Sequence, residues 1–498
     1  MDHGIKEIII KDTAKYSFAQ YTAQGIGFII STALRAFLGP YYMGIWSILQ
    51  VILCYITYLS LGVTDAAAYK IPFYRGSKDK SSEEEVKNTA FSFIFAVSLL
   101  SSLGLIVAAL LLRKKYPVEV IVGLLSLAIY IILQRFYSFY IILIRAYKNI
   151  TVLSRSMIFD AIVNLVLMFL IVKQFRLYGL YITISILAVL NTLFIYLSTK
   201  YDLSFKFSFK RLKSLVLFGL PLSLNGFLDE ILKSIDRIMI ASMMGITAVG
   251  YYSVAIMGRN YISRLSAGVG VVTIPHIQEI YGKTKEIYDI KKFVIVPTLI
   301  LSYLLPPFLG AAYLASPLFV KLVLPQYTSG ILALQIMFLS TFFLSCAPQP
   351  GQFLITIGKQ ARLIPISLAA IIVNIGLNYI FIKNGFGVSG VAVATSISSF
   401  LVFFTTLIYA MKHFANINEI TLFILKIIWP LFYIISIIIG CEYFVKNNNP
   451  YLLLGIKIVI ICIAALPLFY IINKKSRIFD LFIKSFKNKL EKMVHRDK

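Results

Sequence analysis

The segment LVLFGLPLSLNGFLDEILKSIDRIMIASMM, residues 215–244, is long and apolar enough to cross a lipid bilayer, yet it carries five charged residues near its centre. About 20 apolar residues span a hydrocarbon core, and each charge placed there costs on the order of 2.5 to 3.5 kcal/mol. Its charged residues Asp229, Lys233, Asp236 and Arg237 recur at helical spacing and therefore share one stripe of a helix. We expect this stripe to border a water-filled transport cavity; an ion-pair ladder that joins helices is the alternative.

The whole chain has the composition of a membrane protein. Of its 498 residues 59% are hydrophobic and only 14% are charged, which lies outside the range of soluble domains. The sequence therefore predicts an all-α polytopic membrane protein with about fourteen transmembrane helices. The apolar runs of spanning length lie at 16–36, 41–63, 89–112, 118–143, 156–173, 178–199, 214–243, 247–273, 292–313, 329–355, 363–382, 388–411, 420–443 and 451–472.

The distribution of basic residues predicts the orientation. With a cytoplasmic N-terminus, 32 of the 48 lysines and arginines fall in inside segments and 8 in outside loops. The positive-inside rule then places both termini in the cytoplasm, which suits a multi-pass protein of the plasma (inner) membrane. The exception is a basic run on the outer side, Arg113, Lys114 and Lys115. Because the net charge of +26 resides mainly in short loops, it predicts no nucleic-acid partner.

Two matches of the chain with itself indicate an internal duplication. Residues 39–47 and 245–253 both read GxxxxGxxS, and the triplet Ile-Val-Asn recurs at 162–164 and 372–374. The offset of 206 to 210 residues contains six spans, an even number, so the copies share one orientation and form a parallel repeat. We expect an N-lobe at 1–205, a C-lobe at 206–415, two extra helices at 416–472 and a basic cytoplasmic tail at 473–498, which we interpret as an interfacial helix on anionic lipid.

The sequence contains no sign of an enzyme. The phosphate-binding pattern GxxxxGK[ST] is absent, and the four cysteines stand apart in apolar surroundings without metal-ligand spacing. We therefore expect no catalytic residues, no metal and no cofactor.

Polar residues inside the spans are the candidates for binding and coupling. Arginine binds phosphate in a bidentate manner, and bases slightly outnumber acids within the spans, which favours an anionic cargo. The candidate cavity residues are Arg35, Arg135, Lys233, Arg237, Arg259, Arg264, Asn225, Asn374 and Asn378. The candidates for coupling to a proton or a sodium ion are Asp160, Asp229 and Asp236. Alternatives remain: Arg35 lies near a span end and can snorkel, Asp160 can pair with Arg155 or Lys148, and the amides can join helices.

Three stretches resemble one protein family. They are residues 35–44, residues 235–255 with IDRIMI followed by GYYSVA, and residues 351–379 with GQF and VNIGLNY. They are similar to the polysaccharide (O-antigen type) flippases of the superfamily that also holds multidrug pumps and lipid II flippases. The resemblance implies a V-shaped central cavity between two lobes. It also implies that a polyprenyl-pyrophosphate-linked oligosaccharide passes from the cytoplasmic to the outer leaflet by alternating access.

Two other functions remain on the same scaffold, a multidrug or toxin cation antiporter and a lipid II type flippase. The net charge of the cavity distinguishes the cation antiporter from the flippases, because acidic residues without compensating bases would favour cationic drugs. The expected partners are the lipid-linked oligosaccharide, membrane lipids and the polysaccharide polymerase machinery.

Overall fold

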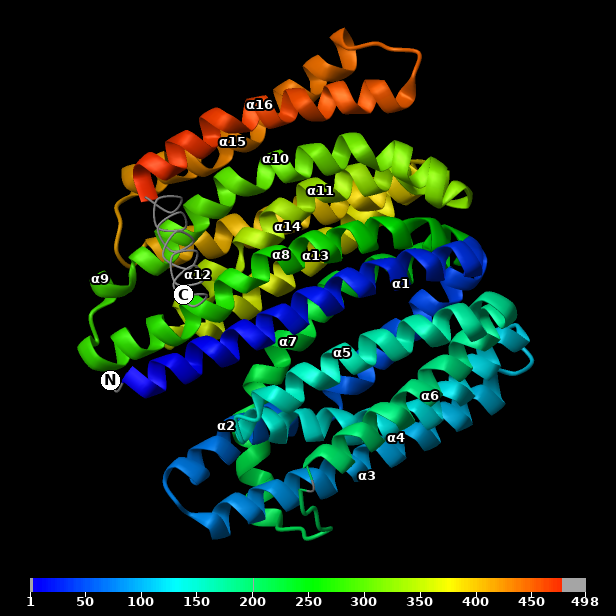
Figure 1. Ribbon diagram of the computed structural model, residues 1–498, viewed down its shortest axis with the longest axis vertical. Coiled ribbons are helices and arrows are strands. Elements are labelled where there is room, and N and C mark those ends of the chain that lie inside the picture. The colour runs from blue at the N-terminus through cyan, green and yellow to red at the C-terminus, as the bar shows by residue number, and fades with distance from the viewer. Residues whose placement is uncertain (1–2, 200, 477–498) are drawn as a thin grey trace, which may run out of the picture. The chain divides into compact units, whose positions relative to one another are not determined.

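The computed structural model describes the backbone of residues 3–199 and 201–476 and the side chains of residues 15–199, 201–264 and 277–474. In these ranges every regular element is a helix, as predicted (Figure 1). The chain divides into two compact units, Met1–Ser253 and Val254–Lys498. We call them the N-terminal and the C-terminal unit and describe each by itself.

The predicted spans correspond to helices throughout the chain. Eleven segments of the described residues are long and apolar enough to cross a membrane. Two of them, Lys15–Tyr58 and Ile150–Thr199, are long enough for two crossings each and contain a break in the helix, at Gly39 and at Arg176. Helix α8, Ile246–Thr284, has 39 residues and is also of spanning length. The prediction of about fourteen transmembrane helices is thereby confirmed.

The N-terminal unit is built on α1, which changes direction at Gly39. The backbone of Gly39 has φ 71° and ψ 172°, and Pro40 follows it, so one long helix becomes two consecutive crossings. Its second half packs against α7, and its first half packs along α5 (Figure 1). The helices of this unit are α1 (His3–Tyr58), α2 (Val63–Gly76), α3 (Lys80–Leu112), α4 (Val118–Ala146), α5 (Ile150–Leu167), the π-helical turn Met168–Val172, α6 (Lys173–Thr199), α7 (Phe209–Met243) and the start of α8.

Helix α2 was not predicted. Residues 70–87 are predicted to form a cytoplasmic loop between the spans 41–63 and 89–112, whereas the chain turns at Gly62 and forms a helix of 14 residues, Val63–Gly76. The helix buries Val63, Ala66 and Ile71 in a cluster with α3, α4 and α7. A narrow apolar face is sufficient for that packing. The opposite face of α2 carries its charged residues.

In the C-terminal unit, α10 is the central helix. The last two helices, α15 and α16, pack on it through a cluster that includes Tyr303 and Leu468, and Trp429 donates a hydrogen bond to the hydroxyl of Tyr303 at 2.9 Å. Helix α14 packs between α11 and α13. The elements are α8 after Ser253, α9 (Ile287–Ile290), α10 (Lys292–Val323), α11 (Ile331–Cys346), α12 (Pro348–Thr356), α13 (Leu363–Lys383), α14 (Gly387–Met411), α15 (Ile417–Phe444), α16 (Pro450–Ser476) and two 3-10 turns, Pro325–Gly330 and Gln360–Arg362.

The compact units do not begin and end where the sequence places the lobes. The N-terminal unit extends to Ser253 and includes α7, because α7 packs against α1, α2 and α3. The predicted boundary at residues 205 and 206 lies in the extended segment before α7 and stays a prediction, as does the V-shaped cavity. The predicted tail falls largely on residues 477–498, which lie outside the described part.

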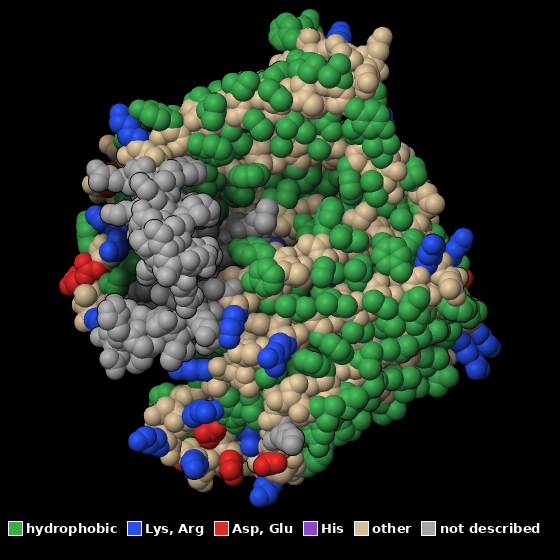
Figure 2. Space-filling model, in the orientation of Figure 1, with side chains coloured by type: hydrophobic (Ala, Val, Ile, Leu, Met, Phe, Trp, Pro, Cys, Tyr) green, Lys and Arg blue, Asp and Glu red, His purple; other side chains and the backbone are tan. Residues whose placement is uncertain are grey.

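The surface has the pattern of a membrane protein. On the face drawn in Figure 2, apolar side chains cover most of the N-terminal unit, and its charged side chains gather toward the ends of its helices. Large apolar residues in the middle of α3 and α4 are exposed, among them Leu100, Leu103 and Ile129. Lipid chains can cover such a surface, whereas water cannot do so without a large cost in free energy.

Candidate functional site

Helix α7 carries the polar stripe, and close backbone contact fixes its position. Gly62, at the turn before α2, faces Gly219 of α7, and a Cβ atom built on either glycine would lie 2.0 to 2.1 Å from the carbonyl oxygen of the other. No side chain fits there. The two glycines thus let α7 approach the α1–α2 turn closely enough for its polar groups to reach α1.

A second close contact joins the two copies of the GxxxxGxxS motif. A Cβ on Gly44 would lie 2.0 Å from the carbonyl oxygen of Ile246, and a Cβ on Gly250 would lie 1.8 Å from that of Pro40. Gly44 corresponds to Gly250, and Pro40 to Ile246, at the repeat offset of 206. The contact is therefore reciprocal, as a two-fold relation between the repeat copies requires.

Two predicted arginines lie at this contact and bind backbone carbonyls. The guanidinium of Arg35, only 5% exposed, donates to Ser253 O at 2.9 Å and to Ser31 at 2.7 and 2.8 Å. The guanidinium of Arg237, 8% exposed, donates to Ser47 O at 3.2 Å and lies 3.9 Å from a carboxylate oxygen of Glu230. These bonds hold α1, α7 and the start of α8 together, so both arginines support the architecture of the site.

The other polar groups on this part of α7 are also paired with neighbouring helices. Asp236 is fully buried and accepts a hydrogen bond from the hydroxyl of Tyr252 at 2.8 Å. Ser234 donates to the carbonyl of Glu230, so the hydroxyl of Tyr55, 2.8 Å from Ser234 Oγ, is the donor in that pair. One turn later on α1, Tyr58 donates to the carbonyl of Gly226 at 2.9 Å.

The remaining two charges of the stripe, Asp229 and Lys233, are exposed. Among the described residues no hydrogen bond or ion pair engages either side chain. They stand one turn apart on a helix of spanning length, where contact with hydrocarbon would cost several kcal/mol. The stripe is thus divided along its length: its C-terminal end is packed and paired, and its middle is exposed.

Three further predicted residues lie elsewhere in the N-terminal unit. Asp160 of α5 is half-buried and accepts a hydrogen bond from Asn191 of α6 at 2.5 Å, so its described partner is neither Arg155 nor Lys148. Arg135 of α4 is half-buried. Asn225 of α7 donates to the carbonyl of Pro221 within its own helix at 3.3 Å.

The C-terminal unit contains the last four predicted residues. Arg259 of α8 is 5% exposed, and no acidic side chain of the described residues lies within 4.0 Å of its guanidinium. Arg264 is exposed and lies over the ring of Tyr261. Asn374 and Asn378 of α13 are fully buried, and the amide of Asn378 donates to Asn374 at 3.0 Å. These two amides bond each other on one helix.

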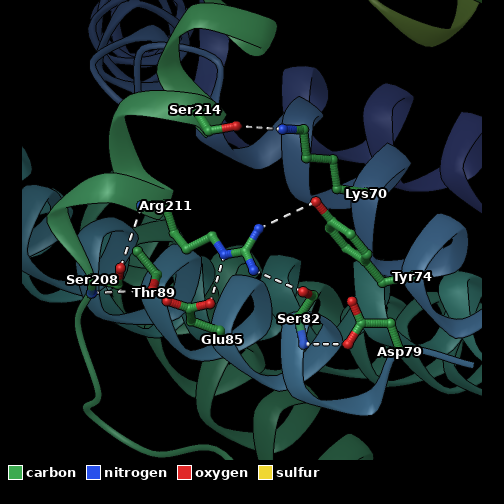
Figure 3. A network of polar contacts seen from close by, with 9 residues as sticks. All are labelled: Lys70, Tyr74, Asp79, Ser82, Glu85, Thr89, Ser208, Arg211 and Ser214. Carbon is green, nitrogen blue, oxygen red and sulfur yellow. Dashed lines mark hydrogen bonds and ion pairs between the residues drawn. The ribbon is translucent and has the colours of Figure 1, made fainter.

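The N-terminal end of α7 is held by a network that was not predicted (Figure 3). Arg211 donates to Glu85 at 2.6 Å, to Ser82 at 2.7 Å and to the hydroxyl of Tyr74 at 3.3 Å. Lys70 of α2 donates to Ser214 of α7 at 2.7 Å. Burial, followed by the positive charge of Arg211, lowers the pKa of Lys70.

The segment between α6 and α7 runs along α3 and is bonded to it. The backbone amides of Ser204 and Ser208 donate to Asn88 and Thr89, at 3.2 and 3.3 Å. Asp79 caps α3 by accepting a bond from the backbone amide of Ser82 at 3.0 Å, and that bond lowers the pKa of the Asp79 carboxyl. The start of α7 is therefore fixed to α2 and α3.

The sequence predicts the polar stripe of α7 but not the groups on α1 and α8 that form hydrogen bonds with it. Tyr55 and Tyr58 are three residues apart on α1, a spacing that places two hydroxyls on one helix face, and this was the available signal. The acceptors Ser47 O and Ser253 O are backbone atoms, for which a side-chain pattern gives no signal. Among the described residues, no three His, Cys, Asp or Glu side chains gather to form a metal site.

Residues 9–281, more than half of the chain, match the family described as polysaccharide biosynthesis protein. The chain belongs to this family. The matched region contains all of α7 and nearly all of α8, and therefore the whole stripe. The match confirms the family that the sequence resembles.

One relative is similar in sequence. An uncharacterised membrane protein of Methanocaldococcus jannaschii is 26% identical over 267 residues. The match covers 50% of this chain and 62% of that protein, so it spans less than two thirds of the relative.

Solved structures of transporters share the fold. The lipid II flippase MurJ in its inward closed conformation superposes with a TM-score of 0.71 at 16% identity, over 92% of this chain and 99% of that chain. An inward-facing multidrug resistance MATE transporter of the MOP superfamily gives 0.66 at 16% identity, over 80% of this chain and 95% of that chain. At such low identity the likeness shows a shared fold and nothing more.

Proposed function

We propose that this protein transfers a polyprenyl-pyrophosphate-linked oligosaccharide, the repeat unit of a surface polysaccharide, from the cytoplasmic to the outer leaflet by alternating access. Membership of the polysaccharide biosynthesis family supports a role in this process, and the fold is one that MurJ, a lipid II flippase, also adopts. The protein acts as a carrier in this proposal and catalyses no reaction. Its place is the plasma (inner) membrane with both termini in the cytoplasm, next to the polymerase that uses the exported unit.

The observation that carries the proposal is the burial of Arg259. A buried arginine in a membrane helix is costly unless an anion or backbone carbonyls compensate its charge, and among the described residues no hydrogen bond or ion pair engages the Arg259 guanidinium. A guanidinium offers paired donors that fit the oxygens of a phosphate group. We therefore assign Arg259 to the pyrophosphate of the cargo.

The exposed pair on α7 is the part of the stripe proposed to meet an anionic headgroup. Lys233 supplies a point charge, and Asp229, one turn away, keeps the net charge of this part of α7 close to zero. Arg264, also exposed, adds a second guanidinium on α8. Arg135, Asn225, Asn374 and Asn378 stay candidates for the glycan. A cation antiporter would instead need carboxylates without adjacent bases.

The membrane potential supplies a driving force. Moving one charge through 100 mV is worth about 2.3 kcal/mol, so a headgroup with about two negative charges is driven outward by about 4 to 5 kcal/mol. Asp160, Asp229 and Asp236 are the proposed sites where a proton or sodium ion is coupled to resetting. Of these, Asp229 is the exposed one.

A flipping assay tests the proposal. The full chain is reconstituted into vesicles that contain a lipid-linked oligosaccharide with a fluorescent glycan, and a membrane-impermeant quencher reports the leaflet. We expect the protein to equilibrate the glycan between the leaflets, and to shift it further when a potassium gradient with valinomycin sets a potential. Transport of a cationic dye instead of the glycan would contradict the proposal and favour the antiporter.

A further inference from the structure

An apolar crevice lies on the N-terminal unit, away from the α7 stripe. Its volume is about 320 Å³, and it is formed by the second half of α1, the end of α3, the start of α4 and Ile246. Its wall includes Ile45, Ile48 and Leu49 of α1, Leu105 and Ala108 of α3, and Leu124 of α4. Apart from Tyr41 and Tyr116 this lining is apolar, so it suits a hydrocarbon chain better than a polar ligand.

The crevice reaches the surface beside the basic turn between α3 and α4. Tyr116, which lines it, is 45% exposed, and the ammonium of Lys115 lies 5.9 Å from the centre of the Tyr116 ring. Arg113 and Lys114 precede these residues and are exposed. Glu119, in the first turn of α4, is the one nearby acid in the chain. The turn beside the mouth thus carries three positive charges, with one negative charge close by in the sequence.

This turn is the exception to the positive-inside rule. Of the eight bases predicted on the outer side, five lie in the N-terminal unit and three of these are consecutive. The rule gives them no role, because it favours bases on the cytoplasmic side. A binding role for the turn explains why three bases are found on the disfavoured side.

We propose that this crevice is a binding site for a phosphate-bearing lipid of the outer leaflet. One hydrocarbon tail lies in the crevice, and Arg113, Lys114 and Lys115 bind the phosphate. The occupant is a lipid because the crevice lies on a helix bundle surrounded by bilayer, where hydrocarbon chains fill any apolar groove. The inference rests on the predicted orientation of the spans and not on the proposed transport.

Native mass spectrometry of the full-length protein tests the site. The protein is purified in mild detergent and equilibrated with equal amounts of phosphatidylglycerol and phosphatidylcholine. We expect one phosphatidylglycerol to bind preferentially. The triple variant R113Q/K114Q/K115Q should bind it about a hundredfold more weakly, because each base near an anionic lipid surface contributes a several-fold factor. The matched control K321Q/K383Q/K446Q removes three exposed bases also predicted on the outer side and should bind as the unmodified protein does.

Two further arms separate the tail from the headgroup. Ala108→Phe fills the crevice and should reduce phosphatidylglycerol binding at least about tenfold, while glycerol 1-phosphate, which has no tail, should fail to displace the lipid. The glutamine substitutions lie on exposed residues, so their result stands even if Ala108→Phe disturbs folding. Equal binding by the first triple variant, an equal loss in the control, or displacement by glycerol 1-phosphate would overturn the site.

Discussion

The guanidinium of Arg237 donates a hydrogen bond to the backbone carbonyl of Ser47 at 3.2 Å. A matching bond runs from Arg35 to the carbonyl of Ser253 at 2.9 Å, and the two acceptors occupy equivalent positions in the repeated motif. Each arginine therefore crosses to the other copy of the motif. The pair fixes the junction of α1, α7 and α8 on which the polar stripe depends.

Replacing Arg237 by Ala should destabilise the protein. Glu230 would lose its ion-pair partner and Ser47 O its donor, so we expect a loss of roughly 2 to 4 kcal/mol in the free energy of unfolding. A thermal midpoint measured in detergent reports this loss. An unchanged midpoint would mean that these interactions of Arg237 contribute little to stability.

Replacing Gly250 by Ala should also destabilise the protein, through steric conflict. The new Cβ would meet the carbonyl of Pro40 at 1.8 Å, and backbone atoms can yield only if the helices separate, which costs at least about 1 to 3 kcal/mol. Gly25→Ala, on α1 with no atom within 4 Å, is the matched control and should be neutral or gain up to about 1 kcal/mol. Equal midpoints for the two variants would refute the close contact.

Arg259 is expected to behave in the opposite way to Arg237. Replacing it by Met keeps the volume and removes a buried charge that lacks a described acidic partner, so stability should stay equal or rise while flipping is lost. Arg362→Met, at an exposed position, is the control and should flip normally. A stability loss of more than about 2 kcal/mol in Arg259→Met would identify a structural arginine instead.

The sequence predicts the spans well because one physical quantity, the length of an apolar run, decides them. It does not show how the α7 stripe is divided. Asp229 and Asp236 lie within about 20° of each other around a helix of 3.6 residues per turn, so periodicity treats them alike. Depth along the axis separates them: the start of α8 covers the end of α7 at Asp236 and leaves Asp229 exposed.

Side-chain patterns also cannot predict contacts that are made by backbone atoms. The sequence shows that the glycines of the motif are repeated. The structure explains why: Gly44 and Gly250 each lie too close to a carbonyl oxygen of the other copy to carry a side chain. Helix α2 was missed for a related reason. Only a narrow face of α2 is apolar and buried, so its sequence contains no long apolar run. Contacts with α3 and α7 stabilise the helix.

The cap of α3 predicts a dependence of stability on pH. The bond from the amide of Ser82 holds the pKa of Asp79 below its ordinary value, so the carboxylate stabilises the fold above that ordinary value. The stabilisation is lost as the pH falls from about 4 through the lowered pKa. Asp79→Asn keeps a capping oxygen without the titration. The variant's midpoint should therefore fall less steeply below pH 4; identical profiles would exclude Asp79 as a source of the acid sensitivity.

The most direct measurement concerns water at the middle of α7. Lys233→Cys is made in a chain in which Cys54, Cys346, Cys441 and Cys462 are replaced by Ser, and the protein in vesicles is treated with a cationic methanethiosulfonate that does not cross bilayers. The control is Ile129→Cys, exposed on α4 among apolar neighbours. The account predicts that the thiol at position 233 reacts and that the thiol at position 129 does not. No reaction at position 233 from either side of the membrane, with Ile129→Cys equally inert, would contradict it.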